Sequence, residues 1–205
     1  MSKSPKKQPP SSLPNLEKLE SDLNRIGQQC AKFLIKNQIR LVLVESCTGG
    51  LVHSTLTQTP GVSSVLTGSF VTYQVDSKTK WLGVPKTLFR SAPDGVSPEI
   101  AGSLAWNALQ KTPHADLAIS ITGRLGPSAD PSEIDSDGYA WLGLALQGEE
   151  KNMTRATAIS FLPGMRPSKS EKGQRELRRA RQILAARGVI EIILGLVQSL
   201  EREEE

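Results

Sequence analysis

Cysteine is scarce in this 205-residue chain, and so are aromatic residues. The two cysteines, Cys30 and Cys47, are too few for a disulfide framework, and they form no CxxC pair or Cys/His cluster of the kind that binds metals. Aromatic residues make up 4% of the chain, so we expect a core built mainly from Leu, Val, Ile and Ala. The sequence therefore indicates neither an oxidising compartment nor a metal or other cofactor.

Long apolar runs are also missing. No uninterrupted stretch approaches the roughly 18 apolar residues that a membrane-spanning helix needs. The first 14 residues are basic and polar and contain no apolar segment of the kind found in secretory signals. We therefore expect a cytoplasmic protein that does not contact membranes.

The net charge of +4 raises the question of nucleic-acid binding. The basic residues gather in the N-terminal tail and between Arg166 and Arg187, where Glu171 and Glu176 are interspersed. A nucleic-acid-binding domain more often shows a dense basic face with exposed aromatic residues. The charge pattern thus favours a solvated surface over a nucleic-acid partner.

The order of apolar patterns predicts one domain over residues 15–200, between a disordered basic tail at 1–14 and a frayed acidic end at 201–205. Buried or alternating apolar runs indicate strands, and three- and four-residue spacing indicates helices. Strands are expected at 40–45, 64–74, 116–121, 139–146 and 154–161, and helices at 15–37, 51–57, 76–82, 86–90, 98–111 and 168–200, with a surface loop at 128–137. This alternation predicts a three-layer α/β/α sandwich around a mostly parallel, mixed sheet with an antiparallel hairpin near one side.

The segment Glu45-Ser-Cys-Thr-Gly-Gly50 directly follows a predicted buried strand and opens a helix. Ligands bind at the carboxyl ends of strands in open α/β sheets, and the first N–H groups of a helix have no partner within it. Ser46 is therefore a candidate nucleophile. The alternative is that Ser46 or Thr48 only caps the helix, and Cys47 is a rival nucleophile without an obvious histidine partner.

A serine nucleophile needs a base, and the chain has only two histidines. His53 follows Ser46 by two helical turns and His114 lies in a turn, so a Ser-His-Asp triad is not expected. A desolvated lysine can accept a proton near neutral pH, and Ser-Lys variants of triad chemistry exist. Lys78, five residues after Tyr73, is a candidate, although a lysine in such a helix is more often solvated.

The second glycine-bearing loop is Thr122-Gly-Arg-Leu-Gly-Pro127, again directly after a predicted buried strand. Two strand-end loops with Thr and Gly suggest two walls of one pocket. Taken alone, this turn is a weak indication.

Together these segments resemble the CinA C-terminal domain family. The resemblance runs from about Leu16 to Leu200, and ESCTGG is its most distinctive run. The matching segments are VESCTGGL at 44–51, PGVSSVLTGSFVTY at 60–73, Lys78 with WLGV at 81–84, GVSPEIA at 95–101, DLAISITGRLGP at 116–127 and the arginine-bearing final helix. The chain is similar to the stand-alone form of the family, which lacks the N-terminal domain of longer CinA proteins.

The resemblance implies an activity and its residues. PncC-type members hydrolyse the carboxamide of nicotinamide mononucleotide to the acid, release ammonia and need no metal. Ser46 matches the family's nucleophile, and Lys78 and Tyr73 match its Tyr-x4-Lys element, with lysine as base and tyrosine as proton relay or orienting group. The residues expected to bind the substrate are Cys47, Thr48, Gly49, Gly50, Thr122, Gly123 and Arg124.

The chain departs from the family pattern beside the pocket. It reads TGRLGP where the family usually reads TGIAGP, and the loop after Pro127 is SADPSEIDSDG where the family has more glycine. The larger Arg124 and Leu125 could narrow the pocket or add a phosphate ligand. Two alternatives to the deamidase therefore stay open: an amidase for another carboxamide, and a non-catalytic binding protein linked to competence or DNA damage. Self-association is expected, since family members of this size commonly form oligomers.

Overall fold

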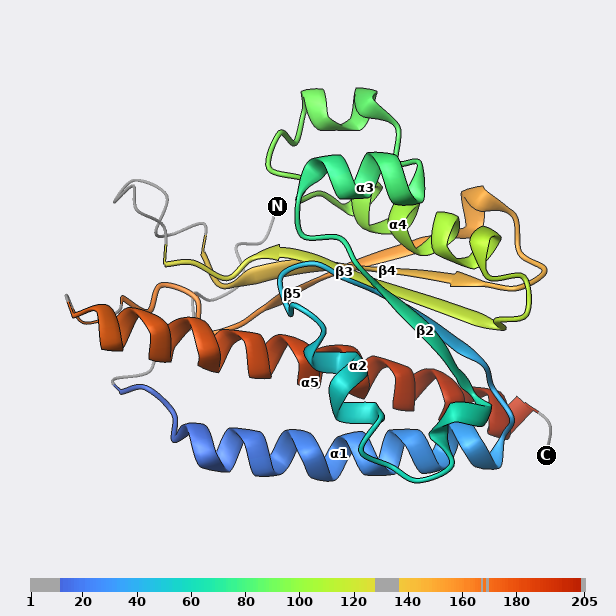
Figure 1. The fold of residues 1–205 in the computed structure, drawn as a ribbon, viewed down its shortest axis with the longest axis horizontal. Helices are drawn as coiled ribbons and strands as arrows, with labels where there is room; N and C mark the ends of the chain where they lie inside the picture. The colour runs from blue at the N-terminus through green and yellow to red at the C-terminus, as the bar shows by residue number, and fades with distance from the viewer. Residues whose placement is uncertain (1–11, 128–136, 167, 169, 204–205) are drawn as a thin grey trace.

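The computed structural model describes residues 12–127, 137–166, 168 and 170–203, and shows helices on both faces of one sheet (Figure 1). The strands are β1 (Leu41–Glu45), β2 (Leu66–Val71), β3 (Leu117–Arg124), β4 (Tyr139–Leu146) and β5 (Arg155–Ser160). They lie in the order β2-β1-β3-β4-β5. The pairs β1–β2 and β1–β3 are parallel, whereas β3–β4 and β4–β5 are antiparallel. Only β4 therefore runs against the other four strands, which confirms the predicted mixed sheet and hairpin.

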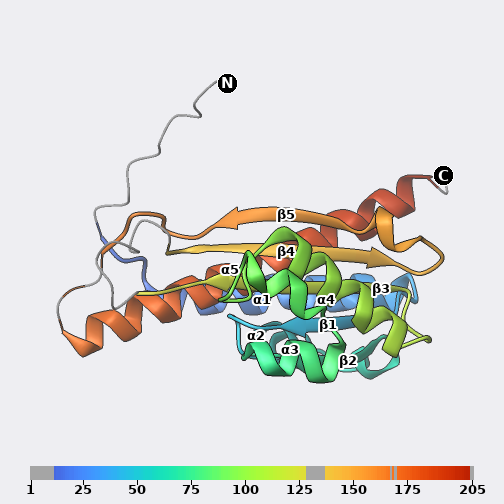
Figure 2. The same cartoon turned by 90° about the horizontal axis from the view of Figure 1, so that it is seen from above.

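Two helical layers cover the sheet, as Figures 1 and 2 show from two directions. One layer contains α1 (Leu16–Lys36), α2 (Leu51–Leu56) and α5 (Glu171–Glu203). The other contains α3 (Val75–Leu82), the 3-10 helix η2 (Lys86–Arg90) and α4 (Pro98–Lys111). Two shorter 3-10 helices, η1 (Val62–Ser64) and η4 (Lys151–Met153), lie in connections. The predicted three-layer sandwich is confirmed.

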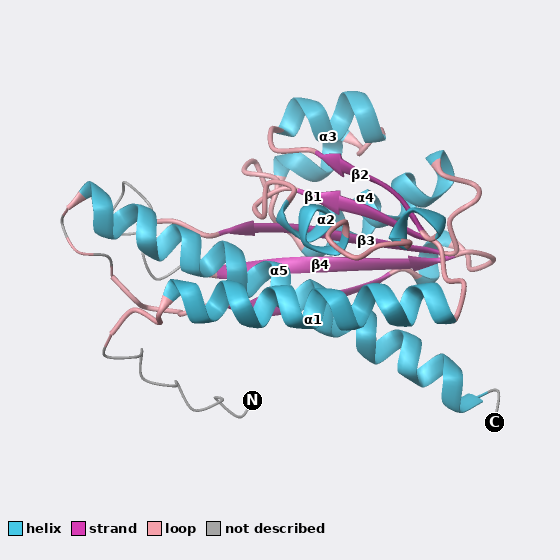
Figure 3. Cartoon of the chain, turned by 60° about the horizontal axis from the view of Figure 1, so that its bottom comes forward, coloured by secondary structure: helices cyan, strands magenta, loops and turns pink. Residues whose placement is uncertain are grey.

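The long helices begin and pack as their sequences indicate. The Asn15 side chain accepts from the Lys18 N–H and caps α1, and Ser97 caps α4 with Pro98 in the first turn. Helix α1 lies beside α5, as Figure 3 shows, and buried apolar residues of both helices belong to one cluster. Cys30 is fully buried in this layer, so its role in packing is confirmed. No helix of the described residues is long and apolar enough to cross a bilayer.

Several element ends differ from the prediction: β2 is shorter than the expected 64–74, and α5 begins at Glu171 and not at 168. β3 continues through Thr122 and Gly123 to Arg124, because β4 pairs with each of these residues. The glycine in this run predicted a loop, but β4 can approach closely there since glycine has no side chain. Helix α5 extends to Glu203, three residues beyond its predicted end. Most of the predicted loop at 128–137 and of the basic tail lies outside the described residues.

Candidate active site

Ser46 lies at the carboxyl end of β1, between the ends of β2 and β3. Its N–H donates to the Ile121 carbonyl of β3, and its own carbonyl accepts from the Gly49 N–H. These bonds fix the backbone on both sides of the hydroxyl, which is largely buried. The strand end thus presents one hydroxyl at the edge of the sheet where ligands of such folds bind.

Glu45 holds the turn that follows Ser46. Its buried carboxylate accepts from the N–H groups of Gly50 at 3.0 Å, Val52 at 3.1 Å and His53 at 2.9 Å. Glu45 therefore accepts from the backbone N–H groups at the start of α2, which the sequence had suggested as donors for a ligand. Sequence analysis missed this role; a charged residue at the end of an apolar strand, just before a helix start, was the available signal.

Lys78 reaches Ser46 from α3. Its Nζ donates to the Ser46 Oγ at 2.9 Å and to the Thr72 carbonyl at 2.8 Å. The side chain is 1% exposed. Burial lowers the pKa of Lys78 from 10.5 to about 8, while Cys47 and Asp94 oppose the shift. A lysine with this pKa exists partly as the neutral amine near neutral pH, and the neutral amine can accept a proton.

Ser46 opens into a cavity of about 520 Å³ between the strand ends and the start of α5. The cavity walls come from the segments at 46–47, 93–96 and 122–126, together with Tyr73, Asp137 and Arg178. Two arginines, Arg124 and Arg178, and two carboxylates line it. Its size suits a small polar molecule.

Three backbone N–H groups near Ser46 have no hydrogen-bond acceptor in another described residue: those of Cys47, which interacts with its own thiol, Thr48 and Gly123. The Ile121 carbonyl faces β1, and strand backbone alternates, so Gly123 faces the same side beyond the last β1–β3 pair. Cys47 and Gly123 also line the cavity. Such donors can stabilise an oxyanion.

Of the other residues named from the sequence, some line this cavity and some do not. Cys47, Tyr73, Thr122, Gly123 and Arg124 line the cavity with Ser46. The Tyr73 hydroxyl accepts from Arg178 Nη2 at 2.7 Å, and the Thr122 hydroxyl donates to the Gly95 carbonyl at 2.7 Å. The structure thus brings Tyr73 to the cavity rim beside an arginine; the hydrogen bond to Ser46 comes from Lys78.

The remaining turn residues stand behind the cavity. Thr48 is buried, and its hydroxyl has no partner among the described residues. Gly49 and Gly50 have positive φ values of 65° and 96°, so they form the turn into α2. Neither Thr48 nor the glycines line the cavity around Ser46.

The rival nucleophile and the histidines fit the site less well than Ser46 and Lys78. Burial raises the pKa of the Cys47 thiol to about 12, so it stays protonated, and a thiol is a far weaker nucleophile than a thiolate. His53 lines a different cavity, together with Thr59 and Leu66. His114 lies after α4, before β3 begins, which is the opposite end of β3 from Thr122.

Several residues of the cavity were missed by sequence analysis, among them Asp94, Arg178 and Asp137, which was predicted in a surface loop but is buried. Asp94 lies in the loop between η2 and α4 and accepts from Arg124 Nε at 2.5 Å. Arg178 lies on α5 and donates from Nη1 to the Gly126 carbonyl at 2.9 Å. The sequence signal for Asp94 was only a Pro-Asp-Gly turn, and Arg178 is one of several arginines in a helix far away along the chain.

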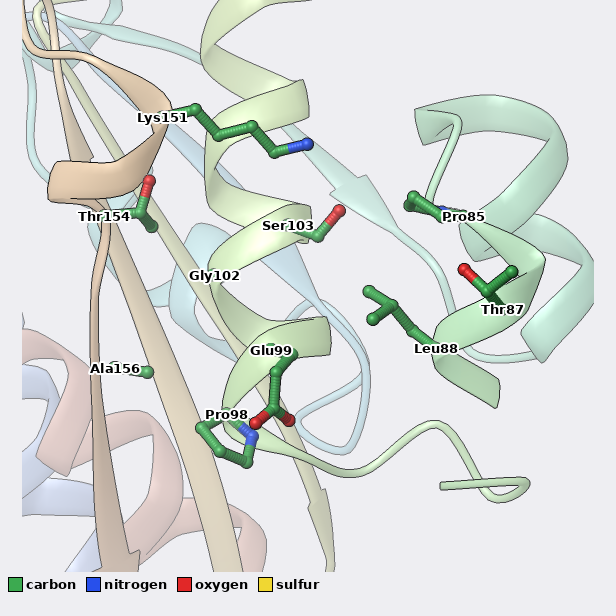
Figure 4. A pocket seen from close by; sticks show the side chains of 10 residues that line it. All are labelled: Pro85, Thr87, Leu88, Pro98, Glu99, Gly102, Ser103, Lys151, Thr154 and Ala156. Carbon is green, nitrogen blue, oxygen red and sulfur yellow. The ribbon is translucent and has the colours of Figure 1, made fainter. Parts of the chain in front are cut away.

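A second cavity of about 340 Å³ lies between α4, η2 and the start of β5. Figure 4 shows the Leu88 side chain facing α4 across it, with Lys151 on the other side. The Ser103 Oγ accepts from the Asn107 amide, and the buried Thr154 hydroxyl has no partner among the described residues, so neither hydroxyl contacts a base. The second cavity therefore lacks the arrangement that makes the first cavity a candidate for catalysis.

Fold and site together define an open α/β protein with a buried serine-lysine pair at the carboxyl edge of its sheet. The sequence model of the CinA C-terminal domain family matches residues 23–163, so the chain belongs to that family. A curated relative, the CinA-like protein of Desulfotalea psychrophila, is 38% identical over 112 residues, which are 55% of this chain and 27% of that protein. The chain spans no more than a third of the length of the curated relatives it matches.

Two solved structures share the fold. The CinA superfamily protein of Escherichia coli superposes with a TM-score of 0.69 at 24% identity, covering 89% of this chain and 97% of that chain. The competence/damage inducible protein of Agrobacterium tumefaciens gives a TM-score of 0.67 at 24% identity, covering 91% and 99%. At this identity the likeness establishes the architecture alone.

Proposed function

We propose that this chain is an amidohydrolase that deamidates nicotinamide mononucleotide, with Ser46 as nucleophile and Lys78 as base. The observation that carries the proposal is the 2.9 Å hydrogen bond between Lys78 Nζ and Ser46 Oγ. Both groups are buried at the edge of a cavity, and the pKa of Lys78 is lowered to about 8. A base with a pKa near the working pH and in contact with a hydroxyl is the arrangement that nucleophilic catalysis needs.

The reaction proceeds in two balanced steps. Neutral Lys78 takes the Ser46 proton as the hydroxyl oxygen attacks the amide carbon, and N–H groups at Cys47 and Gly123 bind the oxyanion. Lys78 then returns the proton to the amide nitrogen, ammonia leaves, and an ester joins Ser46 to the acyl group. Water, deprotonated by Lys78, hydrolyses this ester and restores the hydroxyl.

The arginines of the cavity support a nucleotide substrate. Arg178 uses Nη1 and Nη2 for two described contacts, and a guanidinium has five N–H donors. Its remaining donors would bind the phosphate, for which arginine geometry is well suited. Tyr73 fixes the guanidinium and so takes an orienting role.

A second candidate is an amidase of the same chemistry for another carboxamide. Arg124 already pairs with Asp94 across the cavity wall, and Leu125 is almost fully buried there. Both side chains are larger than those of the usual family pattern. They would favour a substrate of different shape beside an unchanged Ser46 and Lys78.

The test is ammonia release from nicotinamide mononucleotide by the full chain, compared with Ser46→Ala and Lys78→Met. Matched controls are Ser54→Ala on α2 and Lys80→Met on α3, both at exposed positions. We expect release by the wild type and both controls, and loss in the two site variants. No release by the wild type would reject this substrate, and release from other carboxamides would then favour the second candidate.

If no carboxamide is hydrolysed and none acylates Ser46, as judged by intact mass, the chemistry itself is rejected. Binding of nicotinamide mononucleotide without turnover would then indicate a non-catalytic member of the family.

A further inference from the structure

The loop at 93–96 covers Lys78, the base of the proposed reaction. A methyl group built on Gly95 would lie 3.3 Å from Lys78 Cε and 3.4 Å from its Cδ, so the loop passes close to the lysine stem and leaves little space beside it. The Phe89 ring of η2 lies at 3.5 Å from the same point. Asp94 directly precedes Gly95, the residue of this loop that lies next to the Lys78 stem.

Two side chains of β3 hold this loop. The Thr122 hydroxyl donates to the Gly95 carbonyl at 2.7 Å, and Arg124 Nε donates to the Asp94 carboxylate at 2.5 Å. The Asp94–Arg124 pair is about one-third exposed, and both residues line the cavity with Ser46. Strand β3, which supplies the Gly123 N–H, thus also fixes the 93–96 loop that lies over Lys78.

We propose that the Asp94–Arg124 ion pair is a positioning unit of this active site, in which Arg124 neutralises the carboxylate beside Lys78 and keeps the 93–96 loop on the lysine stem. The inference rests on the proposed role of Lys78 as the base. Its test does not need a substrate, because the protonation of Lys78 can be measured directly.

The charges around Lys78 indicate that this ion pair influences the pKa of the lysine. Asp94 and Cys47 act on Lys78 in the direction that raises its pKa, and the buried thiol of Cys47 is itself uncharged. An unpaired Asp94 would therefore hold the proton on Lys78 more strongly. Tyr139 of β4 responds to the same pair: burial raises its pKa, Arg124 lowers it and Asp94 raises it.

The other ionisable groups near Lys78 are engaged elsewhere. Glu45 accepts from three backbone N–H groups of the turn into α2, and Arg178 of α5 contacts Gly126 and Tyr73. On α3 itself, Lys80 pairs with Asp76 at the surface. Asp137 of the same cavity lies 3.9 Å from Arg181, and Asp94 is the carboxylate that raises the pKa of Lys78, so the Asp94–Arg124 pair is a charge arrangement that one substitution can unbalance.

The experiment follows the Cε resonance of 13C-labelled lysine through a pH titration, with Lys78 assigned by its absence in Lys78→Met. In the wild type the midpoint is expected near 8. Arg124→Met should raise it by about one unit, because Asp94 loses its counter-charge at a partly screened site. The double variant Asp94→Asn with Arg124→Met should return the midpoint close to the wild type, and Arg124→Lys should hold it.

The matched control is Arg40→Met, which removes another Arg–Asp pair at the opposite end of β1. It should leave the Lys78 midpoint unchanged. An Arg124→Met midpoint within about 0.3 units of the wild type would overturn the inference, since a full counter-charge at this range shifts a pKa by more than that. Single Asp94→Asn, which should lower the midpoint, decides the case if Arg124→Met does not fold.

The pH profile separates this inference from the proposed function. If the chain deamidates nicotinamide mononucleotide, the acid limb of kcat/KM should shift upward with the Lys78 midpoint in Arg124→Met. If it hydrolyses no carboxamide, the proposed function fails, while the lysine titration still confirms or rejects the role of the ion pair.

Discussion

Lys78 and Arg181 are the two largest fully buried side chains of the described structure, and each carries a cationic head group. Their partners differ. Lys78 donates to one hydroxyl and one carbonyl beside an open cavity. Arg181, on α5, donates to the carbonyls of Leu125, Leu162 and Met165 and lies 3.9 Å from the Asp137 carboxylate. Burial lowers the pKa of both residues.

The comparison shows how the partners of a buried cation decide what it does. Arginine stays protonated in proteins, and Arg181 uses its charge to join three chain segments behind the cavity. Lysine gives up its proton readily when it is desolvated, and Lys78 has few acceptors to hold that proton. Arg181 therefore joins segments around the site, whereas Lys78, with a pKa lowered to about 8, can release its proton near neutral pH.

The largest effect should come from Lys78→Met, which keeps the length of the side chain and removes the amine. We expect deamidation to fall by about 10³-fold or more, since nucleophile activation is lost. The stability should stay equal or rise, because replacing a buried charged group by an apolar one of similar volume is often neutral or stabilising. Turnover and urea unfolding, measured on one preparation, check the expected loss of activity and the expected stability. Activity within tenfold of the wild type would remove Lys78 from the mechanism.

Arg181→Met, unlike Lys78→Met, should lower the stability of the fold. It leaves three carbonyls without their donor and removes a cation beside Asp137, so the free energy of unfolding should fall by about 3–5 kcal/mol. Arg175→Met, on the exposed face of the same helix, should change it by no more than about 0.5 kcal/mol. Urea denaturation of both variants gives the comparison. A loss below about 1 kcal/mol for Arg181→Met would show that this cation is dispensable for the fold.

Most of the fold was accessible from the sequence because its elements carry strong local signals. The three- and four-residue apolar spacing of α1 and the apolar run of β1 depend on neighbours within a few residues, and both elements were predicted correctly to within a residue at each end. The extension of β3 to Arg124 depends on pairing with β4, and no local pattern contains that information.

The candidate site was accessible only in part. The Ser-Cys-Thr-Gly-Gly turn and Lys78 were named from the sequence, and the structure brings Ser46 and Lys78 into contact. Asp94 and Arg178 were missed, because their importance comes from contacts 30 and 105 residues apart along the chain. Residues that act through long-range contacts need the fold before they can be recognised.

The contrast between the two cations can be sharpened by pH. The unfolded chain keeps a proton on Lys78 up to its ordinary pKa near 10.5, whereas the folded chain releases it near 8. Between these values the unfolded state binds more protons, so stability relative to Lys78→Met should rise with pH. The rise should reach about 3 kcal/mol by pH 10.5. Urea unfolding at pH 7, 9 and 10.5 measures it. Lys80→Met should show no such trend, and a flat difference for Lys78→Met would mean that the folded lysine titrates normally.

The smallest effect is expected at Glu45, a buried anion whose partners, like those of Arg181, are backbone groups. One carboxylate oxygen accepts from Gly50 and Val52, and the other accepts from His53. Glu45→Gln turns one of these acceptors into a donor facing an N–H, so the free energy of unfolding should fall by about 1–3 kcal/mol. Because Glu45 orders the turn that carries the Cys47 N–H, kcat should fall more than KM rises. Stability loss with unchanged kcat would limit Glu45 to capping α2, and would leave Lys78 as the buried charge that acts in the chemistry.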